Sequence, residues 1–201
     1  IDLTAFEEFP DAKRLRLDLG MDSENPLVFQ VGRLSVQKDP LAFVKGAARV
    51  LRTYPCAQFA LIGDGPLREE VASCIKDWDL EERVRLLGRR AEAFRLMPAA
   101  DLVTLTSRWE GTPYALLEAM AWSRPVVATA VNGCAEIVID GVTGYVVPAD
   151  DSASWARSVA ELLQDSARAT RMGQQGRLRV EDCFSLKQMA ASIEHLYGEF
   201  V

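Results

Sequence analysis

Residues 102 to 128 read LVTLTSRWEGTPYALLEAMAWSRPVVA, an apolar run, a charged loop, a helical segment and a second apolar run. Leu102–Leu105 and Val126–Ala128 are short and, apart from Thr104, apolar, which is typical of strands buried on both faces of a sheet. The segment from Pro113 to Trp122 has helical periodicity, and proline suits a first helical turn. This order of strand, helix and strand predicts a βαβ unit with two parallel strands.

The same alternation extends through most of the chain. Short apolar runs are separated by segments of helical periodicity, and the connections between parallel strands should be right-handed. The predicted fold class is therefore α/β, a Rossmann-like doubly wound parallel sheet of about six strands. The other predicted strands are Leu27–Val31, Gln58–Ile62, Val84–Leu87 and Tyr145–Val147, and the other predicted helices are roughly Pro40–Tyr54, Leu67–Trp78, Ala91–Pro98 and Ala135–Ile139.

Extra helices are predicted in the last third of the chain. Asp150 and Asp151 can cap a helix that runs to about Leu163, and a second helix follows. Ser185 and Gln188 form the pattern of a capping box, which starts a closing helix. We divide the chain 1–201 into a lead-in of residues 1–24, a Rossmann-like core of residues 25–164, and C-terminal helices over residues 165–201.

Composition excludes several classes of protein. A net charge of −6 without a Lys/Arg cluster argues against nucleic-acid binding. No run of about 18 or more uncharged apolar residues predicts a membrane span, and no signal segment opens the chain. The four cysteines, Cys56, Cys74, Cys134 and Cys183, are scattered, and His195 is the only histidine, so neither a disulfide framework nor a metal site is predicted. We expect a cytoplasmic protein.

Loops that carry glycines and charges follow the predicted strands. The carboxyl ends of parallel strands share one sheet edge, where open α/β sheets bind ligands. Gly32 would let a ligand approach the backbone closely, and Arg33 and Lys38 place two cations there; a solvated loop with incidental charges is the alternative. The loops are Gly32–Lys38, Gly63–Pro66, Gly88–Arg90, Ser107–Thr112 and Asn132–Gly133.

A second anion-binding element is predicted where the helix after residue 112 begins. Thr112 is a good N-cap and Pro113 suits the first helical position. The free N–H groups of Tyr114 and Ala115 would then point toward an anion. Two cations and an open helix N-terminus fit a diphosphate better than a single carboxylate.

Two glutamates lie on either side of this helix start. Glu118 lies about 7 Å along the helix axis from it, and Glu110 precedes it. A carboxylate beside a phosphate is repelled unless hydroxyl donors lie between them, and a sugar and a ribose would supply such hydroxyls. The alternative is that Glu110 interacts with the positive end of the helix and that Glu118 is a surface charge.

These residues together resemble the C-terminal, donor-binding domain of family 4 (group 1) retaining glycosyltransferases, which have the two-domain GT-B fold. The resemblance covers nearly the whole chain, and its most specific part is the E-x7-E motif of Glu110 and Glu118 preceded by Arg33 and Lys38. The matching segments are VGRLSVQKD (31–39), LIGDGP (61–66), AADLVTLTSRWEGTPYALLEAMA (99–121), RPVVATAVNGCAEIVIDGVTGYVVPADD (124–151) and FSLKQM (184–189).

The resemblance implies a role for each matching residue. Arg33 and Lys38 would neutralise the donor diphosphate as the sugar–phosphate bond breaks, Glu110 would hold hydroxyls of the transferred sugar, and Glu118 the ribose. The first three are the candidate catalytic residues, and Leu87 to Arg89 would line the base pocket. The candidate donor-binding residues are Gly32, Gly63, Leu87, Gly88, Arg89, Gly111, Thr112, Tyr114, Ala115 and Glu118.

No metal or other cofactor is expected from this resemblance. A D-x-D pattern, which other transferases use for metal, occurs at Asp77-Trp78-Asp79, but it closes a helix at the opposite edge of the sheet. Departures from the family pattern are Asp39 and Ser123, each where glycine is frequent, and the loop Asn132–Ala135, which is less rich in glycine and proline.

The resemblance also implies a missing half. In this family the acceptor pocket belongs to an N-terminal domain, and Ile1 to Leu3 with Phe6 resemble the interdomain linker, so we expect that domain upstream of a chain that opens without methionine. The predicted function is binding of a nucleotide-diphospho-sugar as half of a retaining, metal-independent glycosyltransferase, and the isolated chain should bind weakly and transfer nothing.

Several points stay open at this stage. The base (UDP, GDP or ADP), the sugar, the acceptor and the oligomeric state are not predicted, and peripheral association of the full-length enzyme with the inner face of a membrane is kept open beside the cytoplasmic location. The alternatives are a non-catalytic nucleotide-binding module and a nucleotide-sugar epimerase or phosphorylase of the same fold. A Rossmann dehydrogenase is disfavoured because no G-x-G-x-x-G joins the first strand to a helix.

Overall fold

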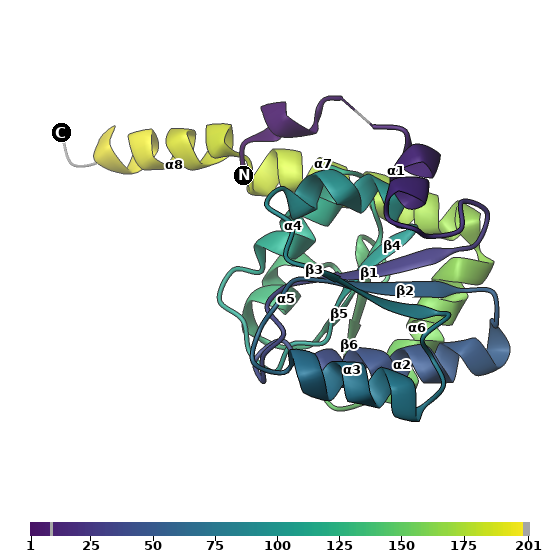
Figure 1. Ribbon diagram of the computed structural model, residues 1–201. Helices are drawn as coiled ribbons and strands as arrows, with labels where there is room; N and C mark the ends of the chain where they lie inside the picture. The colour runs from purple at the N-terminus through teal and green to yellow at the C-terminus, as the bar shows by residue number, and fades with distance from the viewer. Residues whose placement is uncertain (9, 199–201) are drawn as a thin grey trace.

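A computed structural model describes residues 1–8 and 10–198 of the chain (Figure 1). Six parallel strands form one sheet in the order β3-β2-β1-β4-β5-β6, the doubly wound order with its switch point between β1 and β4. All six predicted strands are confirmed. Their bounds are β1 Leu27–Val31, β2 Gln58–Ile62, β3 Val84–Gly88, β4 Leu102–Leu105, β5 Val126–Thr129 and β6 Gly144–Val147.

Helices cover both faces of the sheet (Figure 1). On one face lie α2 (Pro40–Thr53), α3 (Arg68–Asp77) and α6 (Ser152–Gln164), which share one core cluster with alternate strand residues such as Val28 and Phe59. The other face is covered mainly by α4 (Tyr114–Ala121), α5 (Asn132–Ile137), α7 (Ser166–Cys183) and the 3₁₀ helix η2 (Ala93–Ala99). The predicted α/β class and the C-terminal helices are thus confirmed.

Two predicted helices differ from the structure. The segment expected as a helix over Ala91–Pro98 is η2, because in an α-helix the ring of Pro98 would clash with the carbonyl of Phe94, four residues earlier. The helix expected at Ala135–Ile139 is α5, which begins at Asn132, where the carbonyl of Val131 accepts from the N–H of Cys134 at 3.0 Å.

The lead-in contains structure that the sequence analysis did not assign. The 3₁₀ helix η1 (Leu3–Phe6) buries Phe6 against Phe94 and Trp122, with ring centroids 5.3 and 5.1 Å away. Helix α1 (Ala12–Asp18) is capped by Asp11, whose carboxylate accepts from two backbone N–H groups. These residues therefore pack as part of the domain.

The closing helix α8 (Leu186–Gly198) projects from the body of the domain (Figure 1). Its start is fixed by the N–H of Leu186, which donates to the carbonyl of Ile1 at 2.8 Å, and by Ser185 Oγ, which accepts from the N–H of Gln188 at 3.2 Å. The helix contains no buried residue. Among the described residues, no helix has the length and apolarity that a membrane span requires.

Candidate functional site

Three glycines join the loops after β1, β2 and β3 into one surface. The N–H of Gly32 donates to the carbonyl of Ile62 at 2.9 Å, and the N–H of Gly63 donates to the carbonyl of Gly88 at the same distance. A Cβ on Gly63 would lie 1.9 Å from the Gly32 carbonyl oxygen, and the φ of Gly63 is +148°. Only glycine fits this close approach. The structure therefore places three predicted site glycines side by side.

Lys38 and Glu110, predicted separately, form a single ion pair. Lys38 Nζ lies 2.5 Å from Glu110 Oε1, and the two side chains are only 19% and 5% exposed. Ser107 Oγ donates to the same carboxylate oxygen at 2.5 Å. The aliphatic stem of Lys38 packs over Gly32, where a Cβ would lie 3.5 Å from it. A largely buried ion pair is tolerated when extra hydrogen bonds of this kind support it.

Buried polar side chains under this ion pair were missed by the sequence analysis. Thr106 Oγ1 lies 3.1 and 2.8 Å from the carbonyl oxygens of Lys38 and Asp39, and 2.9 Å from Gln30 Oε1. Gln30 Nε2 donates to the Lys38 carbonyl at 3.1 Å, and Thr129 Oγ1 donates to the carbonyl of Ser107 at 2.6 Å. The sequence does contain a signal for this network, namely Gln30 inside the apolar strand β1. Because buried polar groups are almost always hydrogen-bonded, a glutamine there indicates polar partners beside the strand.

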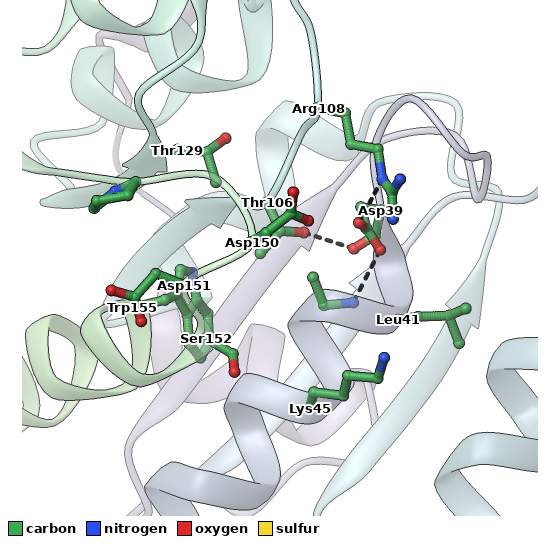
Figure 2. Close-up of a pocket in the computed structure, with 12 residues that line it drawn as sticks. Asp39, Leu41, Lys45, Thr106, Arg108, Thr129, Asp150, Asp151, Ser152 and Trp155 are labelled. Carbon is green, nitrogen blue, oxygen red and sulfur yellow. Dashed lines mark hydrogen bonds and ion pairs between the residues drawn. The ribbon is translucent and has the colours of Figure 1, made fainter.

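Asp39 has a backbone conformation that explains why glycine is frequent at its position. Its φ is +41°, in the left-handed region that glycine adopts without strain. Two contacts of the Asp39 carboxylate offset this backbone strain. The carboxylate accepts from the N–H of Ala42 at 3.1 Å and pairs with Arg108 Nε at 2.8 Å (Figure 2). This hydrogen bond and the charge of Asp39 raise the pKa of Arg108.

The start of α4 differs from its prediction at one residue. Pro113, not Thr112, is the N-cap, because the carbonyl of Pro113 accepts the first helical bond, from Leu116 N–H at 3.0 Å. No side chain caps the helix. Within the described chain, the N–H groups of Tyr114 and Ala115 have no hydrogen-bond partner. The predicted pair of open donors is therefore present, but without the threonine cap.

The loop in front of α4 packs tightly against α5. A Cβ on Gly133 would lie 1.5 Å from the carbonyl oxygen of Gly111 and 3.0 Å from the ring of Pro113. Any side chain at Gly133 would therefore displace the backbone that carries Gly111 and Thr112.

Glu118 is the second acid of the E-x7-E motif. It is half-buried on α4, and its side chain makes no hydrogen bond or ion pair within residues 1–8 and 10–198. Burial raises the pKa of its carboxyl group. A half-buried carboxylate without a donor is unfavourable, so this side chain is suited to accept from hydroxyls of a ligand.

The remaining predicted residues lie along the same edge without close mutual contacts. Arg33 and Arg89 are exposed, and Arg33 forms no ion pair in the described part of the chain. Leu87 is partly buried against the core cluster that also contains α4.

The D-x-D segment closes α3, as predicted, at the opposite edge of the sheet. Trp78 is the C-cap, and Asp79 N–H donates to the carbonyl of Lys76 at 3.0 Å. No group of three or more His, Cys, Asp or Glu side chains suited to a metal ion occurs among the residues that the structure describes.

Comparison with known proteins identifies the relatives of this chain. Alpha-D-kanosaminyltransferase from Streptomyces kanamyceticus is 32% identical over 203 residues, covering 97% of this chain and 52% of that protein. The structure of HepE from Anabaena, solved in complex with UDP, superposes with a TM-score of 0.91 at 27% identity, covering 99% of this chain and 56% of HepE. The chain thus spans about half the length of these two relatives.

A third structure corresponds to this single domain. The C-terminal domain of a group 1 glycosyl transferase from Francisella tularensis has a TM-score of 0.81 at 24% identity, covering 92% of this chain and 99% of that one, and it supports the fold. The family model described as "Glycosyl transferases group 1" matches residues 25–165, well over half of the chain. This chain therefore belongs to the glycosyl transferases group 1 family.

Proposed function

We propose that this chain binds the nucleotide-diphospho-sugar donor of a retaining, metal-independent glycosyltransferase whose acceptor is held by a preceding domain. The observation that carries the proposal is the Lys38–Glu110 ion pair, at 2.5 Å, on the sheet edge that also presents Arg33 and the open start of α4. Relatives solved with UDP or UDP-glucose and relatives named as glycosyltransferases support the donor class.

The ion pair would present a cation and an acceptor to two parts of one ligand. An ammonium has three donors, so Lys38 can keep its bond to Glu110 and still reach a phosphate oxygen. Glu110 receives both Ser107 and Lys38 on Oε1, and no described residue occupies Oε2. That second oxygen would accept from a hydroxyl of the sugar.

The exposed groups would stabilise the leaving diphosphate. Arg33 is free to pair with phosphate oxygens, and the N–H groups of Tyr114 and Ala115 add the positive end of α4. Negative charge grows on the diphosphate as the bond to the sugar breaks, so fixed cations and dipoles stabilise the transition state more than the ground state.

Calorimetry with UDP, GDP and ADP tests this proposal on the present chain. We expect one of the three diphosphates to bind weakly and Arg33→Ala to weaken it about tenfold or more. The matched control is Arg171→Ala, an exposed arginine of α7 without a described partner, which should leave affinity unchanged. Absence of binding by all three nucleotides and their sugars would refute the proposal.

Transfer is tested with the full-length protein. We expect hexosyl transfer with retention of the anomeric configuration, read from the product by NMR, in the presence of EDTA. Inversion, or a requirement for added metal, would contradict the retaining or the metal-independent part. Nucleotide binding without transfer to any acceptor would favour the non-catalytic module instead.

A further inference from the structure

A pocket of about 450 Å³ lies at the amino ends of β1, β4 and β5, at the edge of the sheet opposite the candidate donor site. Its walls are the end of α4, the end of α6 and the first turns of α7, and α7 packs against both of the other helices (Figure 1). None of the candidate catalytic or donor-binding residues lines it. The pocket is therefore separate from the candidate donor site.

Close packing of α7 against the connection from α4 to β5 fixes one wall of this pocket. A Cβ on Gly173 would lie 2.0 Å from the carbonyl oxygen of Ser123 and 3.4 Å from the ring of Pro125. Between these two residues, the N–H of Arg124 donates to the carbonyl of Ala119 at 2.9 Å. The backbone that carries Arg124 is thus held in place, and a preformed wall of this kind lowers the entropic cost of binding.

Arg124 brings an unneutralised positive charge into the pocket. Its side chain is partly buried and makes no hydrogen bond or ion pair within residues 1–8 and 10–198. Nε is enclosed by protein atoms, whereas Nη1 and Nη2 are not, so the two terminal nitrogens stay open to a ligand. Burial lowers the pKa of Arg124, an effect that the negative charge of Asp101 partly opposes. A partly buried cation without an acceptor is unfavourable.

The other charge in the pocket is already paired. Among the described residues that line the pocket, only Asp101 and Arg124 carry a charge. Asp101 Oδ2 accepts from Arg16 Nη2 at 2.9 Å and from the N–H of Leu27 at 2.7 Å. Arg16 is held in turn by the carbonyl of Ala99, which accepts from its Nε at 2.7 Å. One positive charge therefore remains, and it favours a monoanion, because a second negative charge on the ligand would be repelled by Asp101.

The rest of the wall combines apolar side chains with hydroxyl groups. Leu162 and Leu163 at the end of α6 and Pro125 before β5 supply apolar surface. Ser166 and Thr170, in the first turns of α7, supply hydroxyl donors. A ligand that fills this pocket therefore needs an apolar part as well as its negative charge.

We propose that this pocket binds a small monocarboxylate with an apolar body, whose two carboxylate oxygens accept from Nη1 and Nη2 of Arg124. The planar fork of a guanidinium matches a carboxylate in this bidentate way. The apolar body contacts Leu162 and Leu163, which line the same pocket. The site lies away from the donor site and does not depend on the proposed function.

Benzoate and benzamide test the proposal as a matched pair, because they share a ring and a planar head group but differ in charge. The readout is the Nε–Hε signal of Arg124 in a ¹⁵N-resolved NMR spectrum, since this enclosed proton exchanges slowly with water. We expect benzoate to shift the signal with a midpoint on the order of 1–10 mM. Benzamide should bind at least about fivefold more weakly, because its hydrogen bonds to the guanidinium lack the second charge. Inorganic phosphate and UDP should bind more weakly than benzoate.

Two substitutions and a matched control sharpen the test, with binding read from the proton signals of benzoate by saturation-transfer NMR. Arg124→Met keeps an aliphatic stem and should abolish binding without lowering the free energy of unfolding of the free protein, because it removes an unpaired charge. Arg52→Met, at an exposed arginine in the last turn of α2, should leave binding unchanged. Ala169→Phe fills the pocket from α7 and should abolish binding with Arg124 intact, so the test stays valid if Arg124→Met does not fold.

Three outcomes would overturn the proposal. The first is an unmoved Arg124 signal at about 100 mM benzoate, which would mean that water alone occupies the pocket. The second is equal binding of benzoate and benzamide, or benzoate binding that persists in Arg124→Met, because either result would show that the cation is not used. The third is tighter binding of phosphate than of benzoate, which would assign the pocket to phosphate groups.

Discussion

Lys38 Nζ and Glu110 Oε1 lie 2.5 Å apart, from loops 72 residues apart in sequence, so that one contact joins the loop after β1 to the loop after β4 across the switch point of the sheet. The two residues are largely buried. Their roles in donor binding and in stability can therefore be separated by a double-mutant cycle.

Lys38→Met is expected to lower the free energy of unfolding by about 1–3 kcal/mol, because it leaves the Glu110 carboxylate buried with Ser107 as its only described partner. The double variant Lys38→Met/Glu110→Gln should recover most of that loss, since both charges are removed together. Urea denaturation of the wild type, both single variants and the double variant measures the coupling. Additive effects would show that the ion pair contributes nothing to the free energy of unfolding. Donor affinity should be lost in both single variants and should not return in the double variant.

Two residues at left-handed backbone positions should respond to glycine in opposite ways. Ser123 has φ +54° and follows α4, where its N–H donates to Met120 and the N–H of Arg124 donates to Ala119, the two bonds of a Schellman motif. Ser123→Gly removes the strain and should stabilise the domain by about 1 kcal/mol. Asp39→Gly removes the same strain but also the cap of α2 and the bond to Arg108, so it should destabilise by a similar amount.

Thermal unfolding of these two variants provides the measurement. Ser123→Ala, which keeps a Cβ at the strained position, is the control for Ser123→Gly and should give no gain. A stabilised Asp39→Gly would mean that its carboxylate contacts contribute less than the strain.

The sequence predicted the strands and their shared edge because each strand is a short apolar run that must be buried on both faces. It also pointed to Asp39 and Ser123 as unusual, through the family resemblance, without showing that both have positive φ. The Lys38–Glu110 contact could not be predicted, because it depends on how far two loops reach across the sheet edge. Thr112 was misassigned because a proline can follow the N-cap or itself be the N-cap, and only backbone geometry decides.

Glu118→Gln should change stability and donor binding in opposite directions. Burial raises the folded-state pKa of Glu118 above its ordinary value of 4.5, so the folded state favours the protonated form. Protonation of Glu118 therefore stabilises the folded state. This stabilisation is present below the pKa of Glu118 in the unfolded chain and is lost as pH rises through its pKa in the folded state. Relative to wild type, the variant should be equally stable near about pH 4 and more stable, by about 1 kcal/mol at most, near about pH 7.

Denaturation at a series of pH values measures this difference, and Glu81→Gln, at an exposed position in the turn before β3, should show none. Donor affinity near neutral pH should fall about fivefold to tenfold in Glu118→Gln, because a charge-assisted bond to a ribose hydroxyl becomes a neutral one. Unchanged affinity would leave Glu118 without a role in the site.

The apolar side chains of α8 should drive weak self-association of the isolated chain. Leu186, Met189, Ile193, Leu196 and Tyr197 recur at helical spacing and are 44–72% exposed, a patch of a kind that monomeric proteins rarely leave uncovered. Ile193→Glu/Leu196→Lys should abolish concentration-dependent sedimentation and change the free energy of unfolding of this chain by less than about 0.5 kcal/mol, because no residue of α8 is buried. If the proposed first domain covers this helix in the full-length protein, the same pair should destabilise that protein by about 2 kcal/mol or more. Equal small effects in both proteins would show that α8 stays exposed in the full-length protein as well.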